Sequence, residues 1–255
     1  MSVWDMYSTR INAKSSNRDV IVDRTQKYIT KKLRDSASYF NVRIDDISQN
    51  VAIINTDNLN EKFIYSLPNE DIPHGGLVEW MDNYWLVTER DAASEMYTRA
   101  KMIQCNYLLR WIDKDKVIHE QWCVIEDGTK YLTGAYSDRD FITTRGDSRI
   151  VMTISKNEHT TKFNRSNRFL IDDEDSSMML AYELTKPYKL SNVYNRKGVF
   201  KFVLQEVNTT DNDNIELRIA DYYSHFSEDG QEIEASEITI TPEENIDDLG
   251  RQVWL

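Results

Sequence analysis

The side chains that most often carry out chemistry in proteins are scattered along this sequence. Its four histidines are His74, His119, His159 and His225. They show no metal-ligand spacing, and no arrangement with a serine or cysteine indicates a nucleophile. Each histidine is therefore interpreted as a surface or turn residue.

Carboxylates are abundant and gather in two runs, which are Asp172, Asp173, Glu174 and Asp175, and Asp211-Asn212-Asp213-Asn214. Clustered oxygen atoms suit calcium. Neither run, however, has the EF-hand spacing with its central glycine and terminal glutamate. Solvated turns are the favoured interpretation of both runs. No motif points to the carboxylate pair of a glycoside hydrolase. The sequence predicts that the chain is not an enzyme and holds no cofactor or metal.

The only two cysteines, Cys105 and Cys123, lie on either side of a predicted hairpin turn at 113–116. A three-residue loop would place Cys105 directly opposite Cys123. A cross-strand disulfide or thiol pair is one interpretation, and two small apolar strand residues are the other. The second is favoured, because thiols stay reduced in the cytosol.

The elements around these residues are predicted to be mostly strands, because short β-branched runs alternate with polar turns. The strongest signal is the hairpin 76–88. We predict a two-residue turn at Asp82-Asn83, which makes Trp80 face Trp85. Such aromatic pairs stabilise a sheet by roughly 0.2–1 kcal/mol each. The predicted structural core is Trp80, Trp85, Val87, Trp111 and Trp122.

The predicted fold is mainly β, an antiparallel barrel or sandwich with few short helices. Two tandem barrel-like domains are one option, because 78–88 resembles 169–185, and 108–111 resembles 203–205. The expected divisions are an N-terminal arm with β segments at 1–66, barrel-like domains at 67–145 and 146–226, and an acidic C-terminal tail at 227–255.

Composition limits the function classes. The 255 residues carry a net charge of −12, which argues against a broad basic surface that grips nucleic acid phosphates. No apolar run reaches the ~20 residues of a membrane-spanning helix, and the first residues lack the pattern of a signal peptide. We expect a protein of the cytoplasm or of a particle assembled there, without a membrane partner.

A family resemblance rests on three segments. The hairpin Gly76–Thr88 resembles the central hairpin of tailed-phage head-closure and head–tail connector proteins, which are small β-barrels. The segments 105–111 and 126–132 resemble uncharacterised structural proteins of phages and prophages of Gram-positive bacteria. The likeness extends from about Trp4 to Phe226. This chain departs from the family in being longer than a single-barrel connector.

The resemblance implies a virion protein of the phage neck, assembled in the host bacterial cytoplasm and without catalytic residues. Six or twelve copies would form a ring between portal or adaptor proteins and tail proteins. DNA would pass through the lumen without specific binding. An acidic lumen repels phosphate, so we expect the loop Asp172, Asp173, Glu174 and Asp175 to face it. The terminal residues Trp4, Trp254 and Leu255 are candidate contacts between subunits.

Two alternatives remain open. One is another virion part, either a tail-tube or tail-terminator ring or a capsid-decorating protein. The other is a carbohydrate-binding β-sandwich or a hydrolase, suggested only by the aromatic residues Trp80, Tyr84, Trp85 and Tyr107. Exposed aromatic platforms would favour the carbohydrate-binding alternative, whereas buried ones favour a structural protein.

Overall fold

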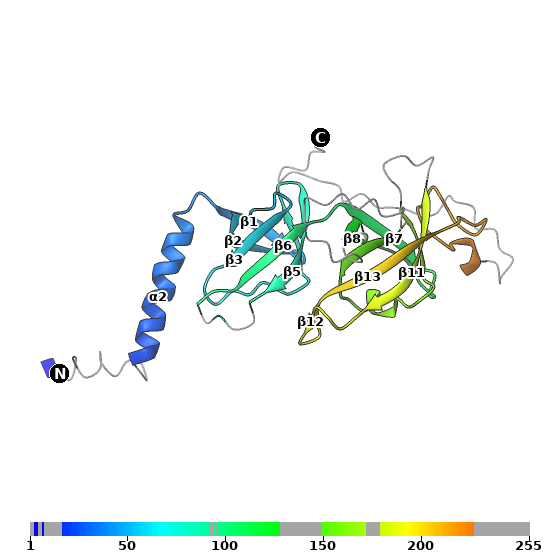
Figure 1. Cartoon of the computed structure of the whole chain (residues 1–255). Coiled ribbons are helices and arrows are strands. Elements are labelled where there is room, and N and C mark those ends of the chain that lie inside the picture. Colours follow the sequence, from blue (N-terminus) through cyan, green and yellow to red (C-terminus); the bar gives the residue numbers. More distant parts are fainter. Residues whose placement is uncertain are drawn as a thin grey trace, which may run out of the picture.

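In the described part of the chain, the helix α2 (Asn17–Arg34) precedes two β domains (Figure 1). The computed structural model describes residues 3–4, 7, 17–91, 94, 96–127, 149–171 and 179–226. The first domain follows α2 and contains β1 (Tyr39–Ile44), β2 (Ile47–Asn55), β3 (Glu61–Ser66), β4 (Leu77–Trp80), β5 (Asn83–Arg90) and β6 (Arg99–Gln104). The second contains β7 (Tyr107–Ile112), β8 (Ile118–Asp127), β9 (Arg149–Ser155), β10 (Arg168–Ile171), β11 (Leu180–Tyr188), β12 (Val193–Tyr194) and β13 (Lys197–Val207), with the short 3-10 helices η1 (Thr160–Lys162) and η3 (Tyr223–His225).

The first domain is a closed antiparallel barrel with the strand order β1-β2-β3-β6-β5-β4. Strand β1 pairs with β2 along its whole length and with β4 through Arg43 and Ile44, which closes the sheet. Alternate side chains point inward, as the two-residue period of a strand requires. The barrel core contains Val42, Ile44, Val51, Ile53, Ile64, Ile72, Val78, Trp85, Val87, Ala100 and Met102.

The second domain is a seven-stranded antiparallel sheet in the order β10-β11-β13-β9-β8-β7, with β12 paired to β13. Its two edge strands approach each other, and the Tyr107 hydroxyl donates a hydrogen bond of 3.1 Å to the carbonyl oxygen of Leu170. The enclosed core is aromatic: Phe163 contacts Phe169 edge to face with ring centroids 5.0 Å apart. The expectation of a mainly β protein with two barrel-like sheets is confirmed.

The two domains share one strand order. When the short strand β12 is left out, the first three strands of each domain form a meander, the last three form another, and the third strand pairs with the sixth. Strands β4 and β5 therefore correspond to β10 and β11, in agreement with the predicted likeness of 78–88 to 169–185. The likeness of 108–111 to 203–205 does not fit, because β13 corresponds to β6, whereas β7 begins the second domain.

The domain boundaries differ from the expected divisions at 66 and 145. Strands β1, β2 and β3 lie before residue 66, yet they form half of the first barrel. Strands β7 and β8 lie before residue 145, yet they belong to the second sheet. The observed boundary falls between β6 and β7, at Cys105-Asn106, because the barrel closes only when β1–β3 pair with β4–β6. The expected tail at 227–255 lies outside the described residues.

The predicted hairpin forms, but its turn lies one residue earlier than expected. Met81 and Asp82 have positive φ values of 50° and 56°, and Trp80 pairs with Asn83 instead of Trp85. The Asn83 amide donates to the Met81 carbonyl at 2.6 Å and accepts from Gln104 at 2.9 Å, which holds Asn83 in the strand. A turn shifted by one residue moves each cross-strand partner by two positions, so every side chain keeps its face.

Candidate functional site

The predicted core residues lie at two levels of burial. Trp85 and Val87 are buried in the first barrel and Trp111 in the second core, whereas Trp80 and Trp122 are partly buried. Trp80 and Trp85 remain neighbours, with ring centroids 5.7 Å apart. None of the four aromatic residues that suggested a sugar platform, Trp80, Tyr84, Trp85 and Tyr107, is exposed. These residues therefore do not form the exposed aromatic platform that would favour carbohydrate binding.

The junction between the two domains is well packed. Leu86, Cys105, Val124 and Val199 form its buried centre, with Leu77, Tyr84, Ile103 and Trp122 around them. The ring of Tyr84, from β5, stacks on that of Trp122, from β8, at a centroid distance of 4.7 Å and an angle of 17°. Trp122 therefore serves the domain junction. The domains are joined by an apolar contact as well as by the chain.

Backbone approaches backbone at the same junction. Gly75, in the connection between β3 and β4, has φ +81°, and a Cβ atom added there would overlap the carbonyl group of Gly198 in β13. The Ser155 hydroxyl, at the end of β9, donates a hydrogen bond of 2.5 Å to the Gly75 carbonyl oxygen. Only glycine permits both this φ and this close approach. The two glycines therefore set how closely the domains meet.

The direct connection between the domains is also held. Asn106 is the second of the two residues between β6 and β7, and its side chain extends the pairing of the second sheet. Its amide donates to the Ile125 carbonyl oxygen at 2.8 Å, and its side-chain oxygen accepts from the Ile125 amide at 2.8 Å. The connection has only two residues, and the Asn106 side chain fixes it to β8 through two hydrogen bonds. It therefore leaves little freedom for hinge motion between the domains.

The cysteines occupy separate environments. The hairpin loop between β7 and β8 contains five residues where three were expected. Cys123 therefore pairs with Tyr107, and Cys105 lies before the start of β7. Both cysteines are free and buried. Burial raises the pKa of Cys105 to about 12 and also raises the pKa of Cys123. Both thiols therefore stay protonated near neutral pH, and the interpretation as small apolar residues is confirmed.

A cleft of about 600 Å³ opens beside the junction, with Asp71, His74 and Arg90 on one side and Tyr194 and Lys197 on the other. His74 is buried, its Nε2 lies 2.9 Å from the Thr88 carbonyl oxygen, and its ring stacks on Tyr194. Because a carbonyl only accepts, Nε2 carries the hydrogen. His74 lies in a turn, as one of the two expected placements has it, although its side chain is buried, and it lines the cleft.

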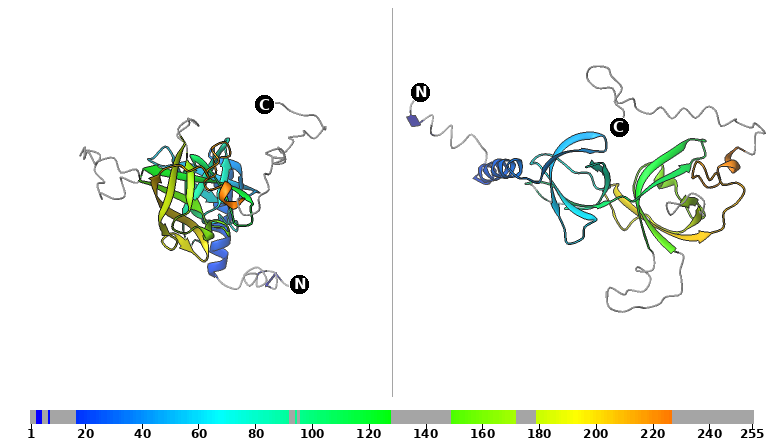
Figure 2. Two further views of the ribbon diagram at one scale, coloured as in Figure 1. Left: turned by 90° about the vertical axis from the view of Figure 1, so that its right-hand side faces the viewer. Right: turned by 90° about the horizontal axis from the view of Figure 1, so that it is seen from above.

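The helix α2 is only partly covered, with Val20, Val22, Ile29 and Leu33 among its half-buried residues. None of its residues is buried, and both Ile21 and Tyr28 are 62 % exposed. It extends from the side of the first domain that faces away from the second domain (Figure 2).

The 18 residues of α2 carry six basic and two acidic side chains, whereas residues 39–104 carry five basic and eleven acidic ones. The helix is a basic arm on an acidic barrel. No helix in the described part of the chain is long and apolar enough to cross a membrane.

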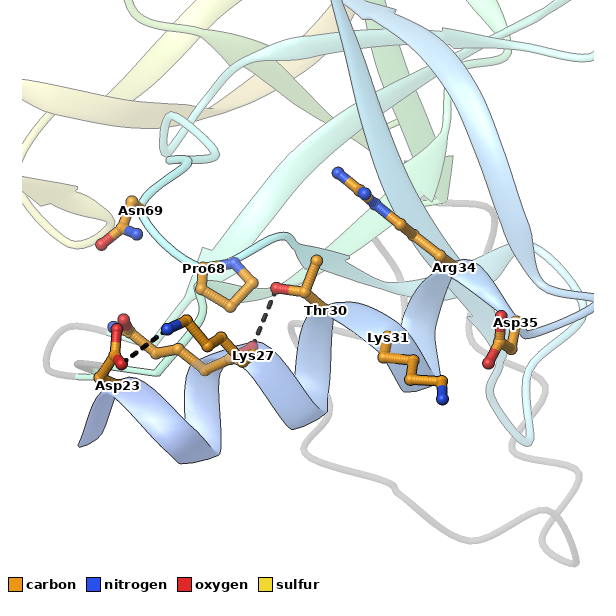
Figure 3. A pocket seen from close by; sticks show the side chains of 9 residues that line it. Asp23, Lys27, Thr30, Lys31, Arg34, Asp35, Pro68 and Asn69 are labelled. Carbon is orange, nitrogen blue, oxygen red and sulfur yellow. Dashed lines mark hydrogen bonds and ion pairs between the residues drawn. The ribbon is translucent and has the colours of Figure 1, made fainter. Parts of the chain in front are cut away.

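A groove of about 460 Å³ separates α2 from Pro68 and Asn69 in the connection between β3 and β4 (Figure 3). The helix lines it with Lys27, Lys31 and Arg34. Lys27 pairs with Asp23 at 3.0 Å, an i,i+4 contact along the helix. Only a few tenths of a kcal/mol come from such a pair. The groove is therefore lined by three basic side chains together with the carboxylates of Asp23 and Asp35.

The predicted subunit contacts and lumen loop are described only in part. Trp4 is 76 % exposed and contacts Tyr7 edge to face at 6.0 Å. Trp254 and Leu255 lie outside the described residues, as do Asp172, Asp173, Glu174 and Asp175. The interface and lumen assignments of all these residues stay predictions.

Two histidines that are 40 residues apart in the sequence meet in the second domain. The rings of His119, in β8, and His159, just before η1, have centroids 3.9 Å apart. His119 Nε2 lies 2.9 Å from Oδ2 of Asp113, at the end of β7, and His159 Nδ1 lies 4.0 Å from the same oxygen. The hydrogen bond to His119 lowers the pKa of Asp113 to about 2. The interpretation as a surface or turn residue is wrong for His119, which lies in β8 with its side chain 15 % exposed, and no sequence spacing signals the cluster.

The acidic run at 211–214 is not a solvated turn at Asp213. Its carboxylate is 1 % exposed and forms a bidentate pair with Arg168 of β10, at 3.0 and 2.8 Å. The backbone amides of Thr210 and Asp221 donate to the same carboxylate at 2.7 and 2.8 Å. These bonds occupy both oxygens of Asp213. The loop is therefore attached to the second sheet by a buried ion pair.

The comparison with protein families gives one match. The model of the YomX N-terminal domain matches residues 16–104. These residues are α2 and the complete first barrel, so the matched segment ends where the structure places the domain boundary. The name comes from a Bacillus prophage gene, and the match indicates a phage-related protein. A search of curated proteins found no match, and neither did a search of solved structures.

Proposed function

We propose that this chain is a structural protein of a tailed-phage virion, a head-closure or connector ring that joins portal to tail and retains or guides DNA. The observation that carries the proposal is the exposed basic helix on an acidic barrel, because both lie inside the segment that matches a phage-related family. A neighbouring copy of the same chain offers the acidic surface that such a helix requires.

The energetics of α2 support an assembled state. Most helical stability in proteins comes from packing of an apolar face and not from intrinsic helix propensity. Ile21 and Tyr28, one heptad apart, leave such a face open in the single chain. Insertion of the helix of one copy against the barrel of the next would be a heterologous contact, which closes into a ring when the rotation permits.

Charge supports the DNA-guiding part of the proposal. A net charge of −12 gives repulsion of phosphate at close range, and nothing in the composition favours tight binding of duplex DNA. A ring of such subunits would let DNA slide through its lumen. Its partners would be further copies of itself, portal or adaptor proteins on one side and tail proteins on the other.

The proposal predicts the oligomeric state of the purified chain. We expect a closed ring of six or twelve copies by native mass spectrometry or light scattering. The double substitution Ile21→Ser and Tyr28→Ser should raise the concentration for half-assembly at least tenfold, since about 1.4 kcal/mol corresponds to a factor of ten. Circular dichroism should show an intact β fold in the variant.

Leu190→Ser provides the matched control, because Leu190 is 88 % exposed in the second domain, away from α2. This control should assemble like the wild type. A wild-type chain that stays monomeric at all concentrations, or an α2 variant that assembles as readily as the control, would contradict the proposed ring contact.

A further inference from the structure

The geometry around Asp113 points to a metal site: we propose that Asp113, His119 and His159 bind one divalent transition-metal ion of the zinc class. Each side chain offers one ligand atom, and all three atoms lie within 4.8 Å of one another. They come from the end of β7, from β8 and from the segment after β9. A bound ion would therefore join three separate parts of the second domain. The inference is independent of the proposed virion role.

The distances suit a shared ion. Zinc binds histidine nitrogen and carboxylate oxygen at about 2.0–2.2 Å, so two of its ligand atoms lie roughly 3–4 Å apart. Asp113 Oδ2 is 2.9 Å from His119 Nε2 and 4.0 Å from His159 Nδ1. Small side-chain rotations would bring all three atoms to the same centre. The three ligands leave a fourth tetrahedral position open to water or to another molecule.

The Nδ1 atom of His159 gives independent support. It is buried and has no hydrogen-bond partner among the described residues, although the rest of the ring is partly exposed. A buried polar atom without a partner is unfavourable, because it has lost its hydrogen bonds to water. The atom faces the Asp113 carboxylate at a distance too long for a hydrogen bond. A metal ion between the two groups would give the nitrogen a partner.

The carboxylate of Asp113 is already oriented for this role. Its Oδ1 accepts hydrogen bonds from the amides of Asp115 and Val117, at 2.9 and 3.3 Å, within the hairpin turn. These bonds direct Oδ2 toward the two histidines. Outer hydrogen bonds of this kind hold metal-binding side chains in place. The turn therefore supplies a fixed oxygen, and β8 supplies the first nitrogen.

Lys162 competes for the same oxygen. Its ammonium group lies 3.8 Å from Asp113 Oδ2, and its side chain is 60 % exposed. A long exposed side chain can turn into solvent, so Lys162 would leave when a doubly charged ion binds. Removal of this positive charge should strengthen metal binding. If the cluster were only a set of ion pairs, removal of the Lys162 charge would not produce tighter metal binding.

The donor set selects the metal. Calcium and magnesium prefer sites made entirely of oxygen atoms. Two imidazole nitrogens and one carboxylate suit zinc, cobalt or nickel. The ligand class is therefore a divalent first-row transition ion, with zinc as the probe of choice and magnesium as the negative probe.

The test uses the full chain, freed of metal with a chelator and titrated with zinc chloride in a calorimeter. We expect one zinc per chain, a rise in melting temperature with zinc and no rise with magnesium. His159→Gln and Asp113→Asn should each weaken zinc binding at least tenfold, and Lys162→Gln should tighten it. His225→Gln, a histidine outside the cluster, is the matched control and should bind like the wild type.

Absorption of the cobalt complex provides a second readout that does not depend on stability. A tetrahedral cobalt spectrum in the wild type and its loss in His159→Gln would support the site even if a variant is less stable. Absence of zinc binding by the wild type would overturn the proposal. Equal binding by wild type, His159→Gln and Asp113→Asn would also overturn it.

Discussion

Gly75→Ala is expected to lower the free energy of unfolding by about 3 kcal/mol or more and to loosen the domain junction. The added Cβ would overlap the backbone of Gly198, and alanine is strained at the φ of +81°. Rotation of a side chain cannot relieve the overlap, because the obstacle is a carbonyl group. The two domains must separate or β13 must shift. Calorimetric unfolding should then show two transitions in place of one.

Ser155→Ala is the comparison for this prediction. It removes only the hydrogen bond to the Gly75 carbonyl and should cost about 0.5–1.5 kcal/mol without separating the transitions. An alanine at position 75 that costs no more than Ser155→Ala would mean that the domains do not meet through these glycines.

Asp213→Asn is expected to lower the free energy of unfolding by about 3–5 kcal/mol, the typical loss when one partner of a buried ion pair is removed. The asparagine amide would place N–H donors against the guanidinium of Arg168 and the amide of Thr210, which are donors themselves. Urea unfolding at neutral pH measures the loss. Asp211→Asn, at an exposed position in the same loop, is the control and should change stability by less than about 0.5 kcal/mol.

The same pair gives a pH dependence. Burial alone would raise the pKa of Asp213, but the amides of Asp221 and Thr210 together with Arg168 outweigh it and hold that pKa below the usual value of 3.8. A lowered pKa stabilises the folded state above the unfolded pKa, and this stabilisation is lost as the pH falls through the folded value. The difference between wild type and Asp213→Asn should therefore shrink below about pH 4. A difference that stays constant down to pH 2 would contradict this assignment.

The hairpins show how far the sequence could predict the fold. The turn residues and alternating apolar positions located β4-β5 and β7-β8, because turns and two-residue periods are local signals. Both registers were nevertheless wrong by two positions. At the first turn, Asn83 donates a hydrogen bond to Met81 and accepts one from Gln104, and these bonds hold the register; Gln104 belongs to a different strand. A contact of that kind cannot be read from the hairpin alone.

The features missed by sequence reasoning depend on long-range packing. His119 and His159 meet because β8 and the segment after β9 lie side by side in the second sheet, and Arg168 reaches Asp213 across 45 positions of the chain. Trp122 was predicted as a core residue, but its stacking with Tyr84 belongs to a junction between domains. The boundary at Cys105-Asn106 carries no glycine, proline or charge signal.

The most direct test of the virion proposal is the protein content of purified phage particles. Particles would be produced in a bacterial host from a phage whose genome encodes this chain, purified, and analysed by quantitative mass spectrometry and cryo-electron microscopy. The proposal predicts six or twelve copies per particle, in a ring between portal and tail, with α2 against the neighbouring subunit. Absence of the chain from intact particles would contradict a structural role in the virion, and a position in the tail tube or on the capsid surface would contradict the connector assignment.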